Sequence, residues 1–262
     1  MPLSESELQE LARARHLLEH PGIAARIAGI AGKPIERTLA ALPDRVSSMI
    51  DEIARRSISK ALDVAVKTMD PTRPAAAADW WHKLAAGASG AAGGAFGMAG
   101  LAVELPNSTT IMLRSIADIA RSQGEDLKTP ESRLECLHVL ALGGSSKADD
   151  ATDAGYFASR AALAQAIASA SQYLAQHGTA KGSAPVLVRL ISEVASRFSI
   201  AVSEKALAQA VPMIGAIGGG AINALFIDHF QDMGRGHFTV RRLERAHGTD
   251  VVREAYLALP RR

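Results

Sequence analysis

The sequence predicts an all-α protein, a single multi-helix bundle with two central glycine-rich helices packed against each other. Small residues dominate, with 22 glycines and many alanines, whereas aromatic residues make up only 4% of the chain. This composition favours closely packed helices over sandwiches and barrels, in which β-branched and aromatic residues prevail. Apolar residues also recur at three- and four-residue intervals through much of the chain, which is typical of amphipathic helices.

The first glycine-rich helix is expected over residues 86–100. On a helix its glycines form one bare face: Gly87, Gly90, Gly93, Gly94, Gly97 and Gly100. Each glycine costs about 0.5–1 kcal/mol relative to alanine inside a helix, so this face needs a closely packed partner. The expected partner is Ala206–Ile227, an uncharged stretch with its own glycine cluster at positions 215 and 218–220.

Two uncharged stretches, residues 84–103 and 206–227, are each about as long as a bilayer-spanning helix. The first consists mostly of alanine and glycine, which contribute little transfer free energy, so we expect a soluble fold rather than a membrane anchor. Trp80 and Trp81 precede this stretch. They suit either a membrane interface or a core position beside a small-residue helix.

Start and stop signals mark the other helices. Ser4 and Glu7 form a capping-box pattern, and the segment Thr129-Pro130-Glu131 is typical of a helix start. Breaks are expected at Pro106, where one helix would end and the next begin, and at Gly234-Arg235-Gly236. Further helices are expected over residues 44–69, 155–178, 238–247 and 249–260.

Charge and cysteine content limit the classes of function. The net charge is only +2, and no basic run is interleaved with aromatic residues, so no nucleic-acid partner is expected. Cys136 is the only cysteine, which favours a reducing compartment. The first residues carry neither a basic nor an apolar signal region, so we expect a cytoplasmic protein, peripheral on the inner face of the cell membrane. We divide the chain into an N-terminal helical extension, residues 1–42, and an all-α domain, residues 43–262.

No catalytic signature is present. The sequence lacks a P-loop, a Cys-x-x-Cys pair, a Gly-x-Ser-x-Gly elbow and a His-Glu-x-x-His motif. His16 and His20 have the i,i+4 spacing of metal ligands, but no third ligand completes the set. Asp149, Asp150 and Asp153 lack the spacing and the distal glutamate of a calcium-binding loop. We therefore expect no catalytic residue, no metal and no cofactor.

The candidate ligand-binding residues are polar groups set among apolar stretches: Glu104, Arg114, Tyr156, Arg160, Lys205, Asn223 and His229. An unpaired buried charge costs several kcal/mol, so one interpretation is that these groups pair with one another and hold the bundle together. The other interpretation is a polar pocket at the crossing of the glycine-rich helices, which would bind a lipid head group or a small anion.

The order of several motifs resembles the EcsC family of bacterial proteins. The resemblance covers about residue 40 to the C-terminus, and it implies a helical protein with frequent membrane association but supplies no catalytic residues. The matching residues are the glycine-rich helix running into Glu104-Leu105-Pro106, then Leu113-Arg114, Gly155-Tyr156-Phe157-x-x-Arg160, Arg197-Phe198, Lys205, Pro212-x-x-Gly215, Asn223, Phe226 and Phe238-x-x-Arg241-Arg242.

Together these observations predict a membrane-associated or lipid- or anion-binding helical module rather than an enzyme. Its candidate partners are an anionic membrane surface, a lipid head group or another protein. Two alternatives stay open. One is a soluble hydrolase acting on lipid or phosphate esters, which requires Glu104, Arg114, Arg160 or His229 to converge in one pocket. The other is a protein-interaction or assembly factor.

Overall fold

The computed structural model describes residues 2–19, 43–68, 97–144, 155–178, 184–210 and 219–260. All regular secondary structure in these residues is helical, which confirms the predicted all-α fold. Eight helices cover the described residues: α1 (Glu5–Glu19), α4 (Asp44–Thr68), α6 (Gly97–Ser122), α7 (Pro130–Leu142), α9 (Gly155–His177), α10 (Pro185–Ala210), α12 (Gly219–His247) and α13 (Thr249–Ala258).

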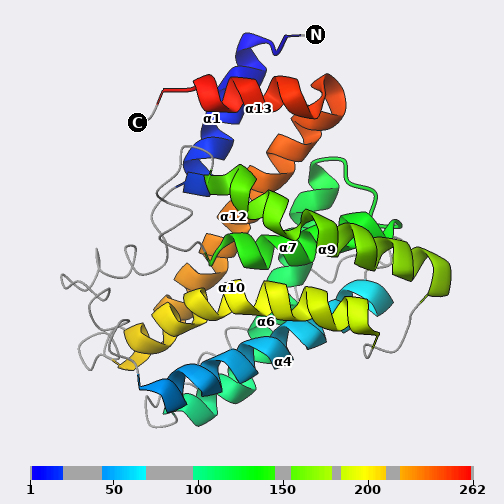
Figure 1. The fold of residues 1–262 in the computed structure, drawn as a ribbon. Coiled ribbons are helices and arrows are strands. Elements are labelled where there is room, and N and C mark those ends of the chain that lie inside the picture. The colour runs from blue at the N-terminus through cyan, green and yellow to red at the C-terminus, as the bar shows by residue number, and fades with distance from the viewer. Residues whose placement is uncertain are drawn as a thin grey trace.

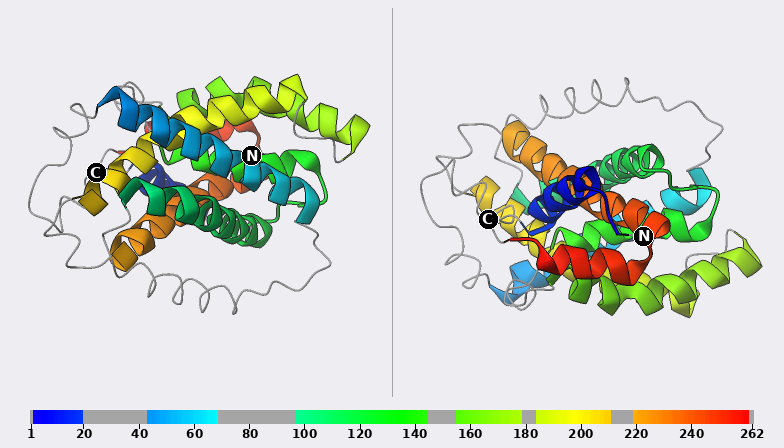
Figure 2. Two further views of the ribbon diagram at one scale, coloured as in Figure 1. Left: turned by 90° about the horizontal axis from the view of Figure 1, so that it is seen from below. Right: turned by 90° about the horizontal axis from the view of Figure 1, so that it is seen from above.

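The long helix α12 runs through the bundle, and α1, α6, α7 and α10 pack along it. Helix α4 lies against α6 and α10, and α9 lies against α7 and α10 (Figure 1). Helices α1 and α13 lie side by side at the end of the molecule where α12 ends (Figures 1 and 2). The arrangement therefore surrounds α12 with helices from both ends of the chain.

Two buried apolar clusters form the core. The larger joins α4, α6, α7, α9, α10 and α12, and the rings of Phe198, Phe226 and Phe230 meet in it with centroids 5.1–6.1 Å apart. The smaller cluster joins α1 and α13 to α9 and to the last turns of α12, through residues that include Leu11, Tyr156, Leu243, Val252 and Tyr256. The N-terminal helix is thus packed into the bundle through its own buried leucine.

The predicted helix starts at Ser4 and Thr129 are confirmed. The N–H of Glu7 donates to Ser4 Oγ at 3.3 Å, and the N–H of Ser4 donates to Glu7 Oε2 at 2.8 Å, which completes the capping box. Thr129 Oγ1 accepts a hydrogen bond from the N–H of Ser132 at 3.2 Å at the start of α7. Gly124, with φ of 81°, follows the end of α6 in the left-handed conformation that glycine favours there.

The predicted break at Pro106 is wrong, because α6 continues from Gly97 to Ser122 with Pro106 inside it. Proline lacks the N–H that would bond the carbonyl four residues earlier, so an interior proline disfavours a helix locally. Here Leu101, Leu105 and Met112 lie on both sides of Pro106 and are buried in the same core. Tertiary packing of this apolar face outweighs the local cost.

The predicted break at Gly234 and Gly236 is also wrong, because α12 runs through both glycines. A Cβ atom at Gly236 would lie 2.7 Å from Cγ of Leu18 and 3.0 Å from the carbonyl oxygen of Ala14. Both of these residues belong to α1. Glycine at position 236 therefore allows α1 to approach the backbone of α12 closely, and it does not end the helix.

We expect Gly236→Ala to lower the free energy of unfolding by about 1–3 kcal/mol, because the added methyl group must displace Leu18 and with it α1. Gly234→Ala is a matched control, since its Cβ would make only ordinary contacts of 3.7–3.8 Å with Ile116 and Ile119. Alanine also has the higher helix propensity, by about 1 kcal/mol, so the control should be neutral or stabilising. Urea unfolding followed by circular dichroism measures both variants, and equal effects would contradict the close approach of α1.

Some predictions lie outside the described residues. These include the crossing of the two glycine-rich helices, because the structure describes the first only from Gly97 onward and excludes residues 211–218 of the second. Trp80, Trp81, His20 and the acidic residues at 149–153 also lie outside them. The division at residue 42 stays a prediction. Among the described helices, none combines the length and the apolar character needed to cross a bilayer.

Candidate functional site

Three of the candidate residues meet in one partly buried contact where α6, α10 and α12 pack together. The ammonium group of Lys205 donates to the two carboxylate oxygens of Glu104, at 3.0 and 2.8 Å, and to Oδ1 of Asn223 at 2.9 Å. Lys205 is completely buried, and its Nζ lies 4.6 Å from the centre of the Phe226 ring. The three protons of the ammonium group therefore each have an acceptor, and an aromatic face covers the charge.

Burial lowers the pKa of Lys205 below its ordinary value, although the carboxylate of Glu104 opposes the shift. The Glu104 side chain is still 36% exposed, so this ion pair lies at the edge of the core. Because the carboxylate neutralises the ammonium, the contact presents no free positive charge to an anion. It joins three helices, as the ion-pairing interpretation of these residues expects.

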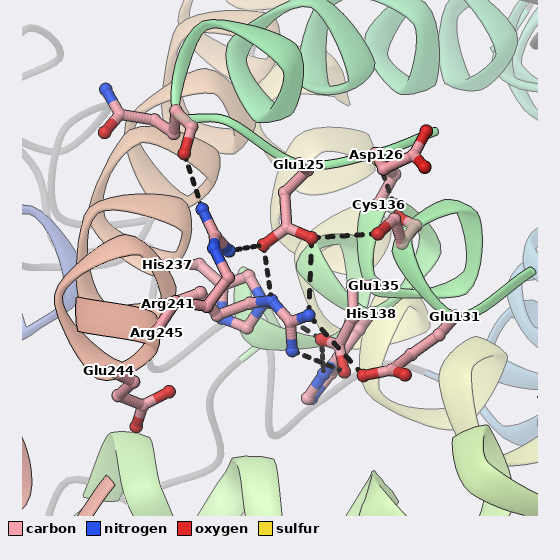
Figure 3. Close-up of polar contacts among 12 residues, drawn as sticks. Glu125, Asp126, Glu131, Glu135, Cys136, His138, His237, Arg241, Glu244 and Arg245 are labelled. Atoms are coloured by element: carbon pink, nitrogen blue, oxygen red, sulfur yellow. Dashed lines mark hydrogen bonds and ion pairs between the residues drawn. The ribbon is translucent and has the colours of Figure 1, made fainter. Parts of the chain in front are cut away.

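A second polar network lies between α7, α9 and α12, with Glu135 of α7 at its centre. Oε2 of Glu135 lies 3.1 Å from Nδ1 of His138 and 3.0 Å from Nε2 of His237 (Figure 3). The other ring nitrogen of His237, Nδ1, lies 2.9 Å from the hydroxyl of Tyr156. Both histidines are buried, with 1% and 0% of their surface exposed. Tyr156, one of the candidate residues, is thus part of a continuous buried chain of polar groups.

Burial and hydrogen bonding determine the protonation states of Glu135, His237 and Tyr156. Burial opposes the ionisation of Glu135, but hydrogen bonds from His138 and His237 outweigh it and hold the pKa of the carboxyl well below its ordinary value. Burial lowers the pKa of His237 to about 4, so its ring is neutral near pH 7. Since Nε2–H donates to the ionised Glu135, Nδ1 accepts a hydrogen bond from Tyr156. Burial raises the pKa of Tyr156, which keeps this donor protonated.

Arg241 of α12 connects Glu135 to a second buried carboxylate, Glu125. Its Nε donates to Oε1 of Glu125 at 2.8 Å, and its Nη1 lies 3.3 Å from Oε1 of Glu135 (Figure 3). Glu125 also accepts a hydrogen bond of 2.9 Å from Ser132 Oγ and pairs with Arg245. Burial opposes the charge on Glu125, but these partners outweigh it and lower the pKa of the carboxyl. The network thus ties α7 and the segment before it to α12.

Arg160 of α9, another candidate residue, pairs with Glu244 of α12 through two hydrogen bonds of 2.7 Å each. Burial opposes the charge on Arg160, but the bound carboxylate outweighs it and raises the pKa of the guanidinium group. A bidentate ion pair of this kind constrains both side chains. It holds α9 against the C-terminal half of α12.

The remaining candidates lie elsewhere. Arg114 is exposed on α6, and buried His229 has its Nε2 2.9 Å from the carbonyl oxygen of Gly143. Glu104, Arg114, Arg160 and His229 therefore occupy four different environments in the described part of the chain, without the convergence that a hydrolase site requires.

A groove of about 260 Å³ lies between α9 and α10. It shares no residue with either network, and it is lined by Gln165, Ala166, Ser169, Pro185, Val186 and Arg189.

The sequence interpretation missed Glu135, His138 and His237, which are the residues in the described ranges that could together hold a metal ion. One signal was present, because Glu135 and His138 have the i,i+3 spacing that places two side chains on one face of a helix. His237, however, lies 102 positions from Glu135. Only the packing of α7 against α12 brings it to the other two.

The fold and the two networks define a class of protein, an all-α bundle whose buried charges are paired with one another across helices. The chain belongs to the EcsC protein family, whose model matches residues 5–243, and the predicted resemblance is confirmed. The match includes α1 and so begins well before the motifs on which the resemblance rested. No curated protein and no solved structure matches the chain.

Proposed function

We propose that this protein is a peripheral membrane-binding module that attaches through the side of the bundle where Glu104 and Lys205, which border its two uncharged stretches, meet. The contact of Lys205 with Glu104 and Asn223 carries the proposal. Glu104 directly follows the uncharged stretch 84–103, Lys205 directly precedes the stretch 206–227, and Asn223 lies within the second. The ion pair therefore holds the ends of both uncharged stretches together.

The described surface on this side also carries exposed apolar side chains. Helix α6 begins, α10 ends and α12 begins on the same side of the molecule, and α4 begins there as well (Figures 1 and 2). Val103, near the start of α6, is 72% exposed, and Met49, near the start of α4, is 49% exposed. Apolar side chains of this kind gain free energy when they enter the boundary between head groups and acyl chains. Attachment of this type needs no helix that spans the bilayer.

Co-sedimentation with lipid vesicles at low ionic strength tests this function. We expect the full chain to sediment with vesicles that contain phosphatidylglycerol. Val103→Glu should weaken binding roughly tenfold, or about 1.4 kcal/mol, because it places a charge on the inserting surface. Val188→Glu is the matched control, since Val188 is 44% exposed near the start of α10, at the other end of that helix from Lys205. It should bind as the unmodified protein does.

Two outcomes contradict the proposed function. In the first, the protein stays in the supernatant with all vesicles at low ionic strength. In the second, both valine variants lose binding to the same extent, which means that the attachment does not depend on the side of the bundle defined by the Lys205 contact.

A further inference from the structure

We propose that Glu135, His138 and His237 form a binding site for one divalent transition-metal ion, of the class that zinc represents. Each of the three buried residues offers one ligand atom, and these atoms all lie within 4.8 Å of one another. Two histidines and one glutamate are an established ligand set for zinc in proteins. This site lies on α7 and α12 and is separate from the Lys205 contact that supports the proposed membrane function.

The spacing of the ligand atoms around Glu135 already approaches that of a metal centre. Oε2 of Glu135 lies 3.1 Å from Nδ1 of His138 and 3.0 Å from Nε2 of His237 (Figure 3). Zinc binds imidazole nitrogen and carboxylate oxygen at about 2.0–2.2 Å, so neighbouring ligand atoms in a tetrahedral site lie about 3.3 Å apart. The two distances at Glu135 need to change by only a few tenths of an ångström.

The nitrogen of His138 that faces Glu135, Nδ1, is its ligand atom in this site. An ion that takes the lone pair of Nδ1 leaves the ring proton on Nε2. Nε2 is buried and has no hydrogen-bond partner in the part of the chain that the structure describes. His237, by contrast, uses both of its ring nitrogens.

The surrounding groups can orient the ligands. If Nε2 of His237 binds an ion, Nδ1 carries the proton and donates it to the oxygen of Tyr156, because a tyrosine hydroxyl can accept as well as donate. Arg241 contacts Oε1 of Glu135 and leaves Oε2 on the side of the histidines. Metal ligands in proteins are held in orientation by hydrogen bonds of this kind from neighbouring groups.

The ligands come from two helices that pack against each other. Glu135 and His138 belong to α7, and His237 belongs to α12. The side chains of the three ligands are 0–10% exposed, so an ion held by them would be shielded from solvent. A bound ion would therefore connect α7 to α12.

Isothermal titration of the chelator-treated full chain with ZnCl₂ tests the site, together with the metal content of the purified protein. We expect one equivalent of zinc per chain and a rise in melting temperature on binding. Tyr156→Phe removes the hydroxyl group that orients His237 and should weaken binding about 10–100-fold. His138→Gln and His237→Gln remove ligands and should weaken it by more than this, about 100-fold or beyond. His229→Gln, which changes another buried histidine of α12, is the matched control and should bind as the unmodified chain does.

Three results would overturn the site. They are the absence of stoichiometric binding by the unmodified chain, unchanged binding in both ligand variants, and an equal loss in His229→Gln. Circular dichroism establishes whether each variant is folded. If the ligand variants do not fold, the test rests on the unmodified chain and on Tyr156→Phe, which keeps the ring in the core. In that case full-strength binding by Tyr156→Phe contradicts the proposal, because the site requires an oriented His237.

Discussion

Glu104→Gln is expected to lower the free energy of unfolding by about 2–4 kcal/mol, because it leaves the ammonium group of Lys205 buried without a counter-charge. Breaking a fully buried ion pair costs about 3–5 kcal/mol, and the lower range reflects the 36% exposure of the Glu104 side chain. Glu52→Gln is the matched control, since it breaks an exposed i,i+4 pair with Arg56. Such surface pairs contribute about 0.3–0.5 kcal/mol. Urea unfolding at neutral pH measures both variants.

The decrease in the free energy of unfolding caused by Glu104→Gln should also depend on pH. The pKa of Lys205 is lowered in the folded protein by burial, whereas an unfolded lysine titrates near pH 10.4. Between these two values the unfolded state binds more protons, so stability rises with pH. Without Glu104 the pKa of Lys205 in the folded protein falls further, so the pH range over which stability rises begins at a lower pH. The deficit of the variant should therefore shrink as the pH is raised toward about 10. A deficit that is constant with pH, or no larger than that of Glu52→Gln, contradicts the ion pair.

Replacing Lys205 tests the same pair from the other side. Glu104→Gln combined with Lys205→Met removes the stranded ammonium and keeps a flexible apolar side chain of similar length beside Phe226. Replacement of both partners of a buried pair by apolar or neutral groups is often neutral or stabilising. We therefore expect the double variant to recover most of the stability lost in Glu104→Gln.

Gly144→Ala is expected to destabilise the protein by about 3 kcal/mol or more. A Cβ atom at this position would overlap the carbonyl oxygen of Arg197 in α10. Overpacking in a core typically costs about 1–3 kcal/mol when side chains can shift. Here the obstacle is backbone, so the turn after α7 and the helix α10 must separate. Thermal and urea unfolding measure the effect.

Two further variants show whether the backbone contact is the cause. Arg197→Ala in the Gly144→Ala background should not restore stability, because it removes the side chain and leaves the carbonyl oxygen in place. Gly234→Ala, which meets no close neighbour, supplies the ordinary effect of glycine-to-alanine substitution in a helix. If Gly144→Ala matches Gly234→Ala in stability, α7 and α10 do not approach as closely as described.

Local sequence patterns predicted the elements whose signals act over a few residues. The capping box at Ser4 and the start of α7 at Thr129 form as expected, because each needs only hydrogen bonds within one turn. The same local reasoning failed at Pro106 and at Gly236. In both cases a helix-breaking residue is overruled by contacts with other helices, through the apolar face of α6 and through the approach of α1.

For the candidate residues, too, the sequence predicted local features but not contacts between helices. The sequence identified Glu104, Lys205, Tyr156 and Arg160 as polar groups in apolar surroundings, but not their partners. Lys205 lies 101 positions from Glu104, and Arg160 lies 84 positions from Glu244. Pairs so far apart in the chain are chosen by the relative placement of helices, for which helical periodicity contains no information.

The sequence by itself determined the all-α class, several of the helix ends and membership of the EcsC family, because composition, caps and motif order are properties of the chain. The tertiary structure alone decided which buried charges pair and that Glu135, His138 and His237 meet. The physical reason is that an amphipathic pattern specifies which face of a helix is buried, whereas the neighbour of that face depends on how all the helices pack into one core.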